Sequence, residues 1–394
     1  MSQTPAPPAG PVPAERALRS VLTSAAAALG VPGEVDALGL PSTRRAVVVL
    51  VDGLGRGVLK RHAGHAPTLR AAMADGGRVL LAATPTTTAA SLTSLGTGLD
   101  VGEHGVAGYD VLDPDRGVVV NQLGGWDEAT DPTVWQPRST VFERAAAAGV
   151  DAVTVSLPEF ERSALTRAGL RGGRYVAARG LLARGRAAEE VLAAAREPTL
   201  LYLYANELDK TGHRHGVGSR DWLHALEEID ALLRRLLSRV PAGTVVLATG
   251  DHGMVDVPAS RRVDYAALGE DGTLVHPELL DGVAHTAGEP RLVQLHFGAD
   301  VDAGRRDAVR AAWQARYGTH AWVLTRDEAE ALGWFGERVE ERVRQRIGDL
   351  IVAAHGDLAL YDGRRVSPRA FEMVGQHGSP TRAEREVPLL QWVR

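Results

Sequence analysis

Residues 45–51 read Arg-Ala-Val-Val-Val-Leu-Val, a short run that is almost wholly apolar and rich in β-branched side chains. A run of this length and composition predicts a strand with both faces buried, as in a parallel sheet that is covered by helices on each side. Residues 150–156, 199–204 and 244–249 have a similar texture. Stretches with helical spacing separate these runs, so the order of elements predicts a doubly wound α/β fold with a mostly parallel sheet.

Polar side chains follow three of these runs at the point where each predicted strand ends. Asp52 follows the first run, Asp209 and His213 lie in a loop after the run at 199–204, and Asp251 and His252 follow the run at 244–249. Because parallel strands of one sheet end at one edge, we expect these side chains to lie close together. Carboxylate and imidazole ligands suit zinc, with manganese or iron as substitutes. The sequence has no cysteine, which excludes thiol catalysis and thiolate-bound metal.

Residues 84–98 read Thr-Pro-Thr-Thr-Thr-Ala-Ala-Ser-Leu-Thr-Ser-Leu-Gly-Thr-Gly and predict a loop that turns into a helix. A hydroxyl at a helix start lies beside unpaired backbone N–H groups and the positive end of the helix dipole. Such a position suits a phosphate, or a hydroxyl that acts as a nucleophile. An ordinary N-cap followed by a buried helix explains the same residues, so the stretch alone leaves both interpretations open.

Length and charge limit the functional classes. With 394 residues, the chain is long enough for one large domain with an insertion. A net charge of -5 and a pI of about 6.2 provide no basic field for binding a nucleic-acid polymer. No apolar run reaches membrane-spanning length and the start lacks a signal-peptide pattern, so we expect a cytoplasmic enzyme.

Amino-acid composition and hydrophobic patterning divide the chain into three parts. Residues 1–14 are rich in proline, alanine and glycine and predict a disordered leader. Residues 15–257 and 346–394 contain the buried runs and the polar clusters, and we expect them to form the catalytic domain. Residues 258–345 combine alternating strand patterns with a helical stretch, which predicts a small α+β insertion that caps this domain.

Six motifs in a fixed order make the sequence resemble a known family. They are Val51-Asp52-Gly53, the stretch from Pro85 to Gly98, Gly102-Glu-His104-Gly105, Glu207-Leu-Asp209-Lys-Thr-Gly-His213-Arg-His-Gly216, Thr249-Gly-Asp251-His252-Gly253 and Gln376-His377-Gly378. The order resembles that of the alkaline phosphatase superfamily and, within it, the type I phosphodiesterase/nucleotide pyrophosphatase branch. The resemblance covers the chain from about residue 45 to the C-terminus, except the insertion.

The resemblance implies a site for two divalent metal ions, with zinc expected first. Asp52, Asp251, His252 and the Thr88 oxygen would hold one ion, and Asp209, His213 and His377 the other. Thr88 matches the family nucleophile, which implies a phosphothreonine intermediate, whereas Thr86 and Thr87 are expected to be loop and cap residues. The implied function is hydrolysis of phosphodiester or pyrophosphate bonds in small phosphorylated substrates, including nucleotides. A phosphomonoesterase, a phosphonate hydrolase and a non-catalytic phospholigand-binding protein are the alternatives.

The candidate substrate contacts lie at and after the threonine stretch. Ser91 stands three residues after Thr88, where the resemblance leads us to expect an Asn donor in diesterases. The other candidates are Tyr109, Asn121, Trp126 and Trp135, with core packing as the alternative for the aromatic residues. His104 is expected to be structural and His215 to be exposed or outside the ligand set, while His285 and Arg291 are either lid residues or ordinary loop residues.

Overall fold

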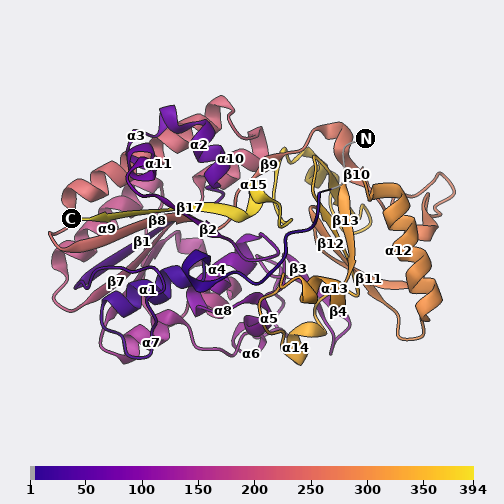
Figure 1. Cartoon of the computed structure of the whole chain (residues 1–394), viewed down its shortest axis with the longest axis horizontal. Coiled ribbons are helices and arrows are strands. Elements are labelled where there is room, and N and C mark those ends of the chain that lie inside the picture. Colours follow the sequence, from indigo (N-terminus) through magenta and orange to yellow (C-terminus); the bar gives the residue numbers. More distant parts are fainter. Residues whose placement is uncertain (1–4) are drawn as a thin grey trace.

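The computed structural model describes residues 5–394, and its main sheet has seven strands. In spatial order these are β2 (Arg78–Leu81), β17 (Glu386–Val393), β8 (Thr244–Gly250), β1 (Arg45–Val51), β7 (Thr199–Ala205), β5 (Asp151–Ser156) and β6 (Arg174–Ala177). β17 runs antiparallel to both of its neighbours, and the pairs formed by β8, β1, β7, β5 and β6 are all parallel. The predicted mostly parallel α/β sheet is confirmed (Figure 1).

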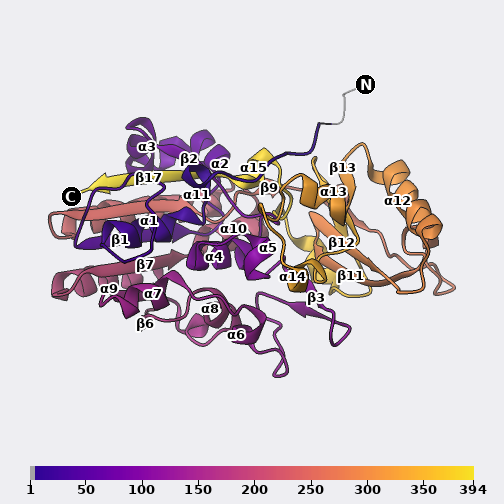
Figure 2. The same cartoon turned by 60° about the horizontal axis from the view of Figure 1, so that its bottom comes forward.

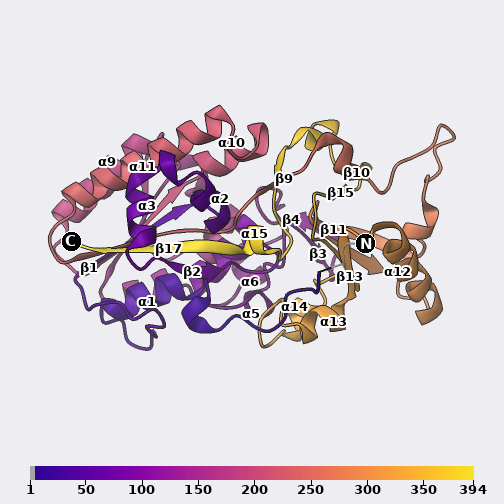
Figure 3. The same cartoon turned by 45° about the horizontal axis from the view of Figure 1, so that its top comes forward.

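Alternate side chains of β1 face two separate hydrophobic cores. Val47 and Val49 belong to one core, and Val48 and Leu50 belong to the other. The first core is covered by α2 (Arg56–Arg61), α3 (Pro67–Ala74), α9 (Leu181–Ala194), α10 (Glu207–His215) and α11 (Arg220–Arg239), and the second by α1 (Ser20–Ala28), α4 (Thr88–Thr97), α7 (Val141–Ala147) and α8 (Ala164–Gly169). Figure 3 shows α3, α9 and α11 on one side of the sheet and α1 on the other. Burial on both faces explains why the strand pattern is continuous rather than alternating.

A second sheet of six antiparallel strands stands beside the main sheet (Figures 1 and 2). Its order is β13 (Ala321–Thr325), β14 (Leu350–Ala354), β12 (Leu292–Phe297), β11 (Val283–Glu289), β3 (Asp110–Asp113) and β4 (Val118–Asn121). Its outer helix α12 (Ala303–Tyr317) packs Val309 and Trp313 into a third core. There are also two short strand pairs: β10 (Arg262–Asp264) with β15 (Ala359–Tyr361), and β9 (Val255–Asp256) with β16 (Gly375–Gln376). In the chain, each of these strands lies between a strand of one sheet and a strand of the other.

The second sheet is larger than the insertion expected at residues 258–345. The hairpin β3–β4 joins it from the segment that follows α4, and β14 joins it from beyond residue 345. The remaining helices are α5 (Val101–His104), α6 (Pro132–Trp135), α13 (Arg326–Ala331), α14 (Glu341–Arg344) and α15 (Arg382–Arg385), with 3-10 turns at Ala14–Arg16, Ala63–His65, Pro158–Phe160, Ala259–Arg261, Pro277–Leu279 and Pro368–Glu372. β14 and β15, which fall within residues 346–394 of the expected catalytic domain, therefore belong to the second sheet and to the pair β10–β15.

The structure also differs from the disordered leader expected over residues 1–14. The indole N–H of Trp322 donates to the carbonyl of Pro5 (2.7 Å), and that of Trp334 donates to the carbonyl of Pro8 (2.9 Å). Buried tryptophans need partners for their indole N–H groups, and an extended proline-rich segment offers free carbonyls. Residues 1–4 lie outside the described residues. No helix within residues 5–394 is long and apolar enough to span a membrane.

Candidate active site at the edge of the main sheet

The central strands β1, β7 and β8 end at the same level. Val51 pairs with Ala205 on one side and with Gly250 on the other, so the residues after each strand emerge together. Asp52 and Asp251 follow directly and are both buried. Asp209 and His213 lie on α10 rather than in the predicted loop, and the four-residue spacing puts both on one face of the helix. Asp209 Oδ1 is 3.3 Å from His213 Nε2.

The polar side chains gather into two overlapping groups that could each hold a metal ion. One group is Asp52, Asp251 and His252, and the other includes Asp209, His252 and His377. In the first, His252 Nε2 lies 3.4 Å from Asp52 Oδ1 and 3.6 Å from Asp251 Oδ2. In the second, His377 Nε2 lies 3.9 Å from Asp209 Oδ1 and 3.3 Å from His213 Nε2. All the predicted ligands therefore converge in one place.

The three histidines are oriented by backbone carbonyls. The Nδ1 atom of His213 is 2.7 Å from the carbonyl of Gly375, that of His377 is 2.8 Å from the carbonyl of Thr86, and that of His252 is 3.0 Å from the carbonyl of Gly253. A protonated Nδ1 donates to each carbonyl and leaves a lone pair on Nε2. Each Nε2 faces the cluster, which is the arrangement that metal-binding histidines adopt.

Within residues 5–394, one oxygen of each of the three carboxyl groups in the cluster has no hydrogen-bond partner, which fits a bound cation. Asp52 Oδ1, Asp209 Oδ1 and Asp251 Oδ2 are buried and accept no hydrogen bond. Burial, together with Asp251 and Asp209, raises the pKa of Asp52 well above its usual value. Burial, together with His252 and His213, lowers the pKa of His377 well below its usual value. Buried carboxylates beside neutral imidazoles form a donor set that divalent cations satisfy, so these residues fit the implied metal ions.

Supporting contacts fix the aspartates. The phenol of Tyr204 donates a hydrogen bond to Asp52 Oδ2. The backbone N–H groups of Gly53 and His252 both donate to Asp251 Oδ1 at 3.0 Å. Gly53 has a φ of 75°, and a Cβ there would lie 3.1 Å from the Cα of Asp209, so glycine permits both the turn and the close approach of α10.

Thr88 is the first residue of α4 and its Oγ1 lies 3.2 Å from His252 Nε2. The expected roles of its neighbours agree with the structure. Thr87 is the N-cap, and its side chain accepts a hydrogen bond from the N–H of Ala90. Thr86 Oγ1 donates to the carbonyl of Ser379 (3.0 Å) and accepts from the N–H of Gly378 (3.0 Å). Thr86 thus joins the threonine loop to the loop that carries His377.

A cavity of about 450 Å³ opens onto this cluster. Thr88, Asp52, Asp209, His213 and His377 line it, together with residues from two walls. What we call the tyrosine wall comes from the main-sheet side and consists of Thr154, Phe160, Leu165, Leu170, Tyr175, Tyr202 and Tyr204. What we call the second-sheet wall consists of Tyr265, Glu289, Tyr361 and Arg365. The sequence reasoning missed both walls, although Tyr202 and Tyr204, two apart on a predicted strand, were a readable signal for one shared face.

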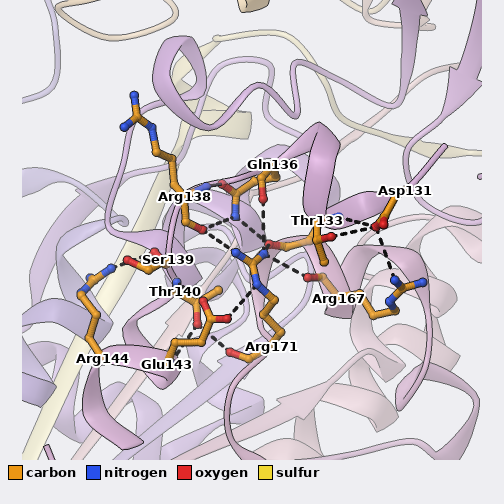
Figure 4. A network of polar contacts seen from close by, with 11 residues as sticks. Asp131, Thr133, Gln136, Arg138, Ser139, Thr140, Glu143, Arg144, Arg167 and Arg171 are labelled. Carbon is orange, nitrogen blue, oxygen red and sulfur yellow. Dashed lines mark hydrogen bonds and ion pairs between the residues drawn. The ribbon is translucent and has the colours of Figure 1, made fainter. Parts of the chain in front are cut away.

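A polar network joins the segment that follows α8, next to Leu170 of the tyrosine wall, to α7 (Figure 4). The guanidinium of Arg171, just beyond α8, donates to the carbonyls of Ala168 (2.7 Å) and Arg138 (2.7 Å) and to Glu143 Oε1 (3.0 Å) on α7. α8 also packs closely on α4, as a Cβ on Gly96 would collide with the carbonyl of Gly169. Leu165 and Leu170 are therefore positioned relative to Thr88.

The predicted substrate contacts divide into two groups. Tyr109 lines the cavity and is 40% exposed. Within residues 5–394, the side chains that line the cavity do not include Ser91, Asn121, Trp126 or Trp135. Ser91 is fully buried within α4, and Asn121 Nδ2 donates to Asp110 Oδ1 (2.9 Å). The indole N–H groups of Trp126 and Trp135 donate to the carbonyls of Gln122 (2.6 Å) and Gly105 (3.0 Å). Ser91 Oγ has no hydrogen-bond partner in the described part of the chain, whereas the other three side chains bond within the protein, and substrate contact by these four residues stays a prediction.

The remaining sequence candidates are structural. His104 is buried, with Nε2 2.8 Å from Ser94 Oγ and Nδ1 accepting from the N–H of Val106, and burial beside Arg342 lowers its pKa to about 3. Arg291 is not a lid residue, because it is buried and pairs with Glu384 Oε2 at 2.7 Å. His285 lies on β11 and is not among the lining residues described over 5–394, and His215 is 3.5 Å from Asp221 on the surface.

Known proteins share both the sequence pattern and the fold. A model of the family described as type I phosphodiesterase / nucleotide pyrophosphatase matches residues 46–380. Human ectonucleotide pyrophosphatase / phosphodiesterase 5 is 17% identical with a TM-score of 0.66, and the match covers 88% of this chain and 87% of that chain. Phosphonoacetate hydrolase from Sinorhizobium meliloti 1021 in complex with phosphonoacetate is 20% identical with a TM-score of 0.64, and the match covers 89% of this chain and 90% of that chain.

A third structure, the inactive variant of murine ectonucleotide pyrophosphatase / phosphodiesterase 5 in complex with AMP, is 16% identical with a TM-score of 0.64, and the match covers 88% of this chain and 87% of that chain. The search of curated proteins found no match. At these identities the solved structures show a shared fold, whereas the family match extends over most of the sequence. The chain therefore belongs to the type I phosphodiesterase / nucleotide pyrophosphatase family of metal-dependent hydrolases, within the alkaline phosphatase superfamily.

Proposed function

We propose that this enzyme hydrolyses phosphodiester or pyrophosphate bonds of small substrates, nucleotides among them, through a phosphothreonine at Thr88. The observation that carries the proposal is the position of the Thr88 hydroxyl. It lies at the start of α4, 3.2 Å from His252, and it lines the same cavity as Asp52 of the first group and Asp209 and His377 of the second. A hydroxyl at this place can attack a phosphorus atom that is held at the cluster.

Two divalent ions complete the proposed site. Asp52, Asp251, His252 and Thr88 Oγ1 would hold one, and Asp209, His213 and His377 would hold the other. Bound there, the ions would lower the pKa of the attacking hydroxyl and of water and would neutralise charge on the phosphoryl group. Imidazole nitrogens and carboxylate oxygens favour zinc, and manganese or iron can occupy the same donor set.

The protein's own residues carry the two steps. Thr88 Oγ1 forms a bond to phosphorus while the bond between phosphorus and the leaving oxygen breaks. Water then attacks phosphorus, the bond to Thr88 Oγ1 breaks, and the threonine hydroxyl is restored. The backbone N–H groups at the start of α4 face the charge that develops on the phosphoryl oxygens. Thr87 and Thr86 hold this turn still, and the enclosing walls limit the access of bulk water.

The walls of the cavity support a substrate with an organic substituent. The tyrosine wall offers aromatic faces and hydroxyl groups but no charged side chain, which suits a nucleoside or another uncharged group. The AMP complex of the murine relative is consistent with this choice. A net charge of -5 argues against a nucleic-acid polymer as the substrate.

Hydrolysis of a carboxylate-bearing phosphonate is the second candidate. Within residues 5–394, Lys210 lines the cavity without an ion-pair partner, and it could pair with such a carboxylate. Arg365, which also lines the cavity, is already paired with Asp110 at 2.9 Å. The complex of the Sinorhizobium meliloti relative with phosphonoacetate favours the same candidate.

One assay tests these alternatives. Zinc-loaded and manganese-loaded protein is supplied with a chromogenic phosphomonoester, a chromogenic diester, a nucleotide-monophosphate ester and phosphonoacetate, and bound metal is counted by elemental analysis. We expect kcat/KM to be highest for the diester or the nucleotide ester, with two ions per chain. A preference for the monoester or for phosphonoacetate supports the alternative hydrolases. Phosphate binding without turnover of any substrate overturns the proposal in favour of a binding protein.

A further inference from the structure

Glu289 is a buried carboxyl group in the second-sheet wall that the proposed reaction does not use. It is the last residue of β11, it lines the cavity, and it is only 6% exposed. One of its oxygens, Oε2, accepts a hydrogen bond of 3.1 Å from the N–H of Tyr109, another cavity residue. The other oxygen, Oε1, is buried and has no hydrogen-bond partner. Burying an oxygen without a hydrogen-bond partner lowers the stability of the folded protein, so a residue that does so at this position calls for an explanation.

Close backbone approach brings Glu289 against Gly378, in the loop that carries His377. A Cβ on Gly378 would collide with Glu289 Cγ, and a Cβ on Gly108 would lie 3.3 Å from Glu289 Oε2. Gly378 follows His377 in the chain, and Gly108 precedes Tyr109. The carboxyl group therefore sits between the loop that carries His377 and the residue that forms the rim of the cavity.

The charges around Glu289 favour its neutral form. Asp110 on β3 and Glu384 on α15 are the charged groups that act on it, and both are acidic. The nearby arginines are already committed, since Arg365 pairs with Asp110 (2.9 Å) and Arg291 pairs with Glu384 (2.7 Å). Burial and the two acids together raise the pKa of Glu289 well above its usual value. A proton on the carboxyl group removes the cost of an unpaired buried charge.

We propose that Glu289 contacts the substrate as a protonated acid, whose Oε1 hydroxyl donates a hydrogen bond to a phosphoryl oxygen. The inference rests on the proposed function, because it takes a phosphoryl group to be bound at the cluster. A neutral acid can donate to an anionic oxygen without bringing another charge, whereas an ionised carboxylate would repel it. The proton stays on Glu289 throughout the reaction, so the residue binds and orients the phosphoryl group and transfers nothing.

The isosteric variant Glu289→Gln is the central test. Its amide oxygen can accept from the N–H of Tyr109, which places the NH₂ group where Oε1 stands. The variant thus keeps a donor but cannot ionise, whereas Glu289→Ala removes the donor. In metal-loaded protein at neutral pH we expect Glu289→Gln to retain kcat/KM for the diester within about 3-fold, and Glu289→Ala to lose about 10- to 100-fold.

The pH profile separates this role from simple packing. In the wild-type enzyme the donor is lost as pH rises through the raised pKa of Glu289, so kcat/KM falls on the alkaline side. In Glu289→Gln this alkaline fall should disappear. Glu278→Gln makes the same chemical change at an exposed position on the second-sheet side, and it should leave the profile of the wild-type enzyme unchanged. An alkaline limb that stays at the same pH in Glu289→Gln, or a loss in Gln as large as in Ala, overturns the proposal.

A binding measurement keeps the test independent of turnover. Calorimetric titration of the metal-loaded variants with inorganic phosphate should show weaker binding for Glu289→Ala than for Glu289→Gln, with the same number of metal ions per chain. If the wild-type protein hydrolyses none of the substrates, the proposed function fails while this comparison can still be read. Equal phosphate affinity in all variants, or a metal ion lost together with Glu289, overturns the assignment of a phosphoryl contact.

Discussion

The two sides of the cavity are built in different ways. At the edge of the main sheet, Asp52, Asp251 and His252 lie one or two residues beyond β1 or β8, and α10, which follows β7, presents Asp209 and His213. Thr88 at the start of α4 and His377 after β16 complete this side from other segments. The second-sheet wall is assembled from β11, from β15 and from the loops that follow β10 and β15. One side places five candidate ligands directly after strands or on the helix that follows a strand, whereas the other depends on how distant segments pack.

This difference teaches how chemistry and selectivity are divided. The level ends of β1 and β8 place Asp52 and Asp251 in a buried part of the protein, where sheet register determines their positions. The opposite wall can change its lining without disturbing that register, because its residues lie on separate segments. We therefore expect substitutions at the sheet edge to abolish turnover. Substitutions in either wall should instead change the rate of turnover or the substrate preference of the enzyme.

Replacing Thr88 should give the largest effect. Thr88→Ala removes the nucleophilic oxygen, and we expect kcat to fall by roughly 10³-fold or more while the fold and the metal content remain. Steady-state kinetics with the diester, circular dichroism and elemental analysis check the three parts of this statement. Thr86→Ser, a change in the loop beside it, is the matched control and should lose far less. Activity close to wild type in Thr88→Ala would place the nucleophile elsewhere and break the comparison.

The Arg291–Glu384 pair joins the two sides, and breaking it should give the next largest effect. Glu384 Oε1 also accepts from the N–H of Ser379, and the Glu384 carbonyl accepts from the N–H of Gly253 next to His252. Arg291→Met leaves the Glu384 carboxylate buried without its partner, which should lower the free energy of unfolding by about 3–5 kcal/mol. Urea unfolding measures this. Arg305→Met breaks the exposed Arg305–Asp281 pair and should change stability by less than about 1 kcal/mol.

The same division explains what the sequence could predict. Strands such as β1 are recognisable because both faces are buried, and ligands such as Asp251 are recognisable because they follow a strand directly. The sequence predicts a loop where α10 forms, because this segment is polar and contains Gly212. Glu289 carries no local signal, because its importance comes from Gly378 and Asp110, which are far away in sequence. The sequence also gives no sign that the indole N–H of Trp135 donates to the carbonyl of Gly105, 30 residues away.

When metal is removed, the stability of the folded protein should depend on pH through Asp52 at the sheet edge. The pKa of Asp52 is raised in the folded protein, so its neutral form is preferred there and folding loses stability as pH rises above the usual carboxyl pKa of about 4. We expect thermal midpoints of the chelated wild-type protein to fall relative to those of chelated Asp52→Asn as pH rises from about 5 to 8, by a few degrees. Zinc should reverse the fall in the wild type. A wild-type midpoint that gains on Asp52→Asn over this range would contradict the assigned direction.

The smallest effect is expected in the tyrosine wall, where two hydroxyl groups should behave in opposite ways. Tyr202 lines the cavity with a buried hydroxyl that has no partner, whereas the hydroxyl of Tyr175 donates to the carbonyl of Leu157 at 2.6 Å. Tyr202→Phe should therefore leave stability unchanged or slightly higher, and raise KM for a nucleotide ester about 3- to 10-fold with little effect on a small monoester. Tyr175→Phe should instead cost about 1 kcal/mol of stability. Thermal unfolding and kinetics with both substrates separate the two cases. If Tyr202→Phe changed KM equally for both substrates, the hydroxyl of Tyr202 would not face the organic substituent. Only the second-sheet wall would then determine substrate preference.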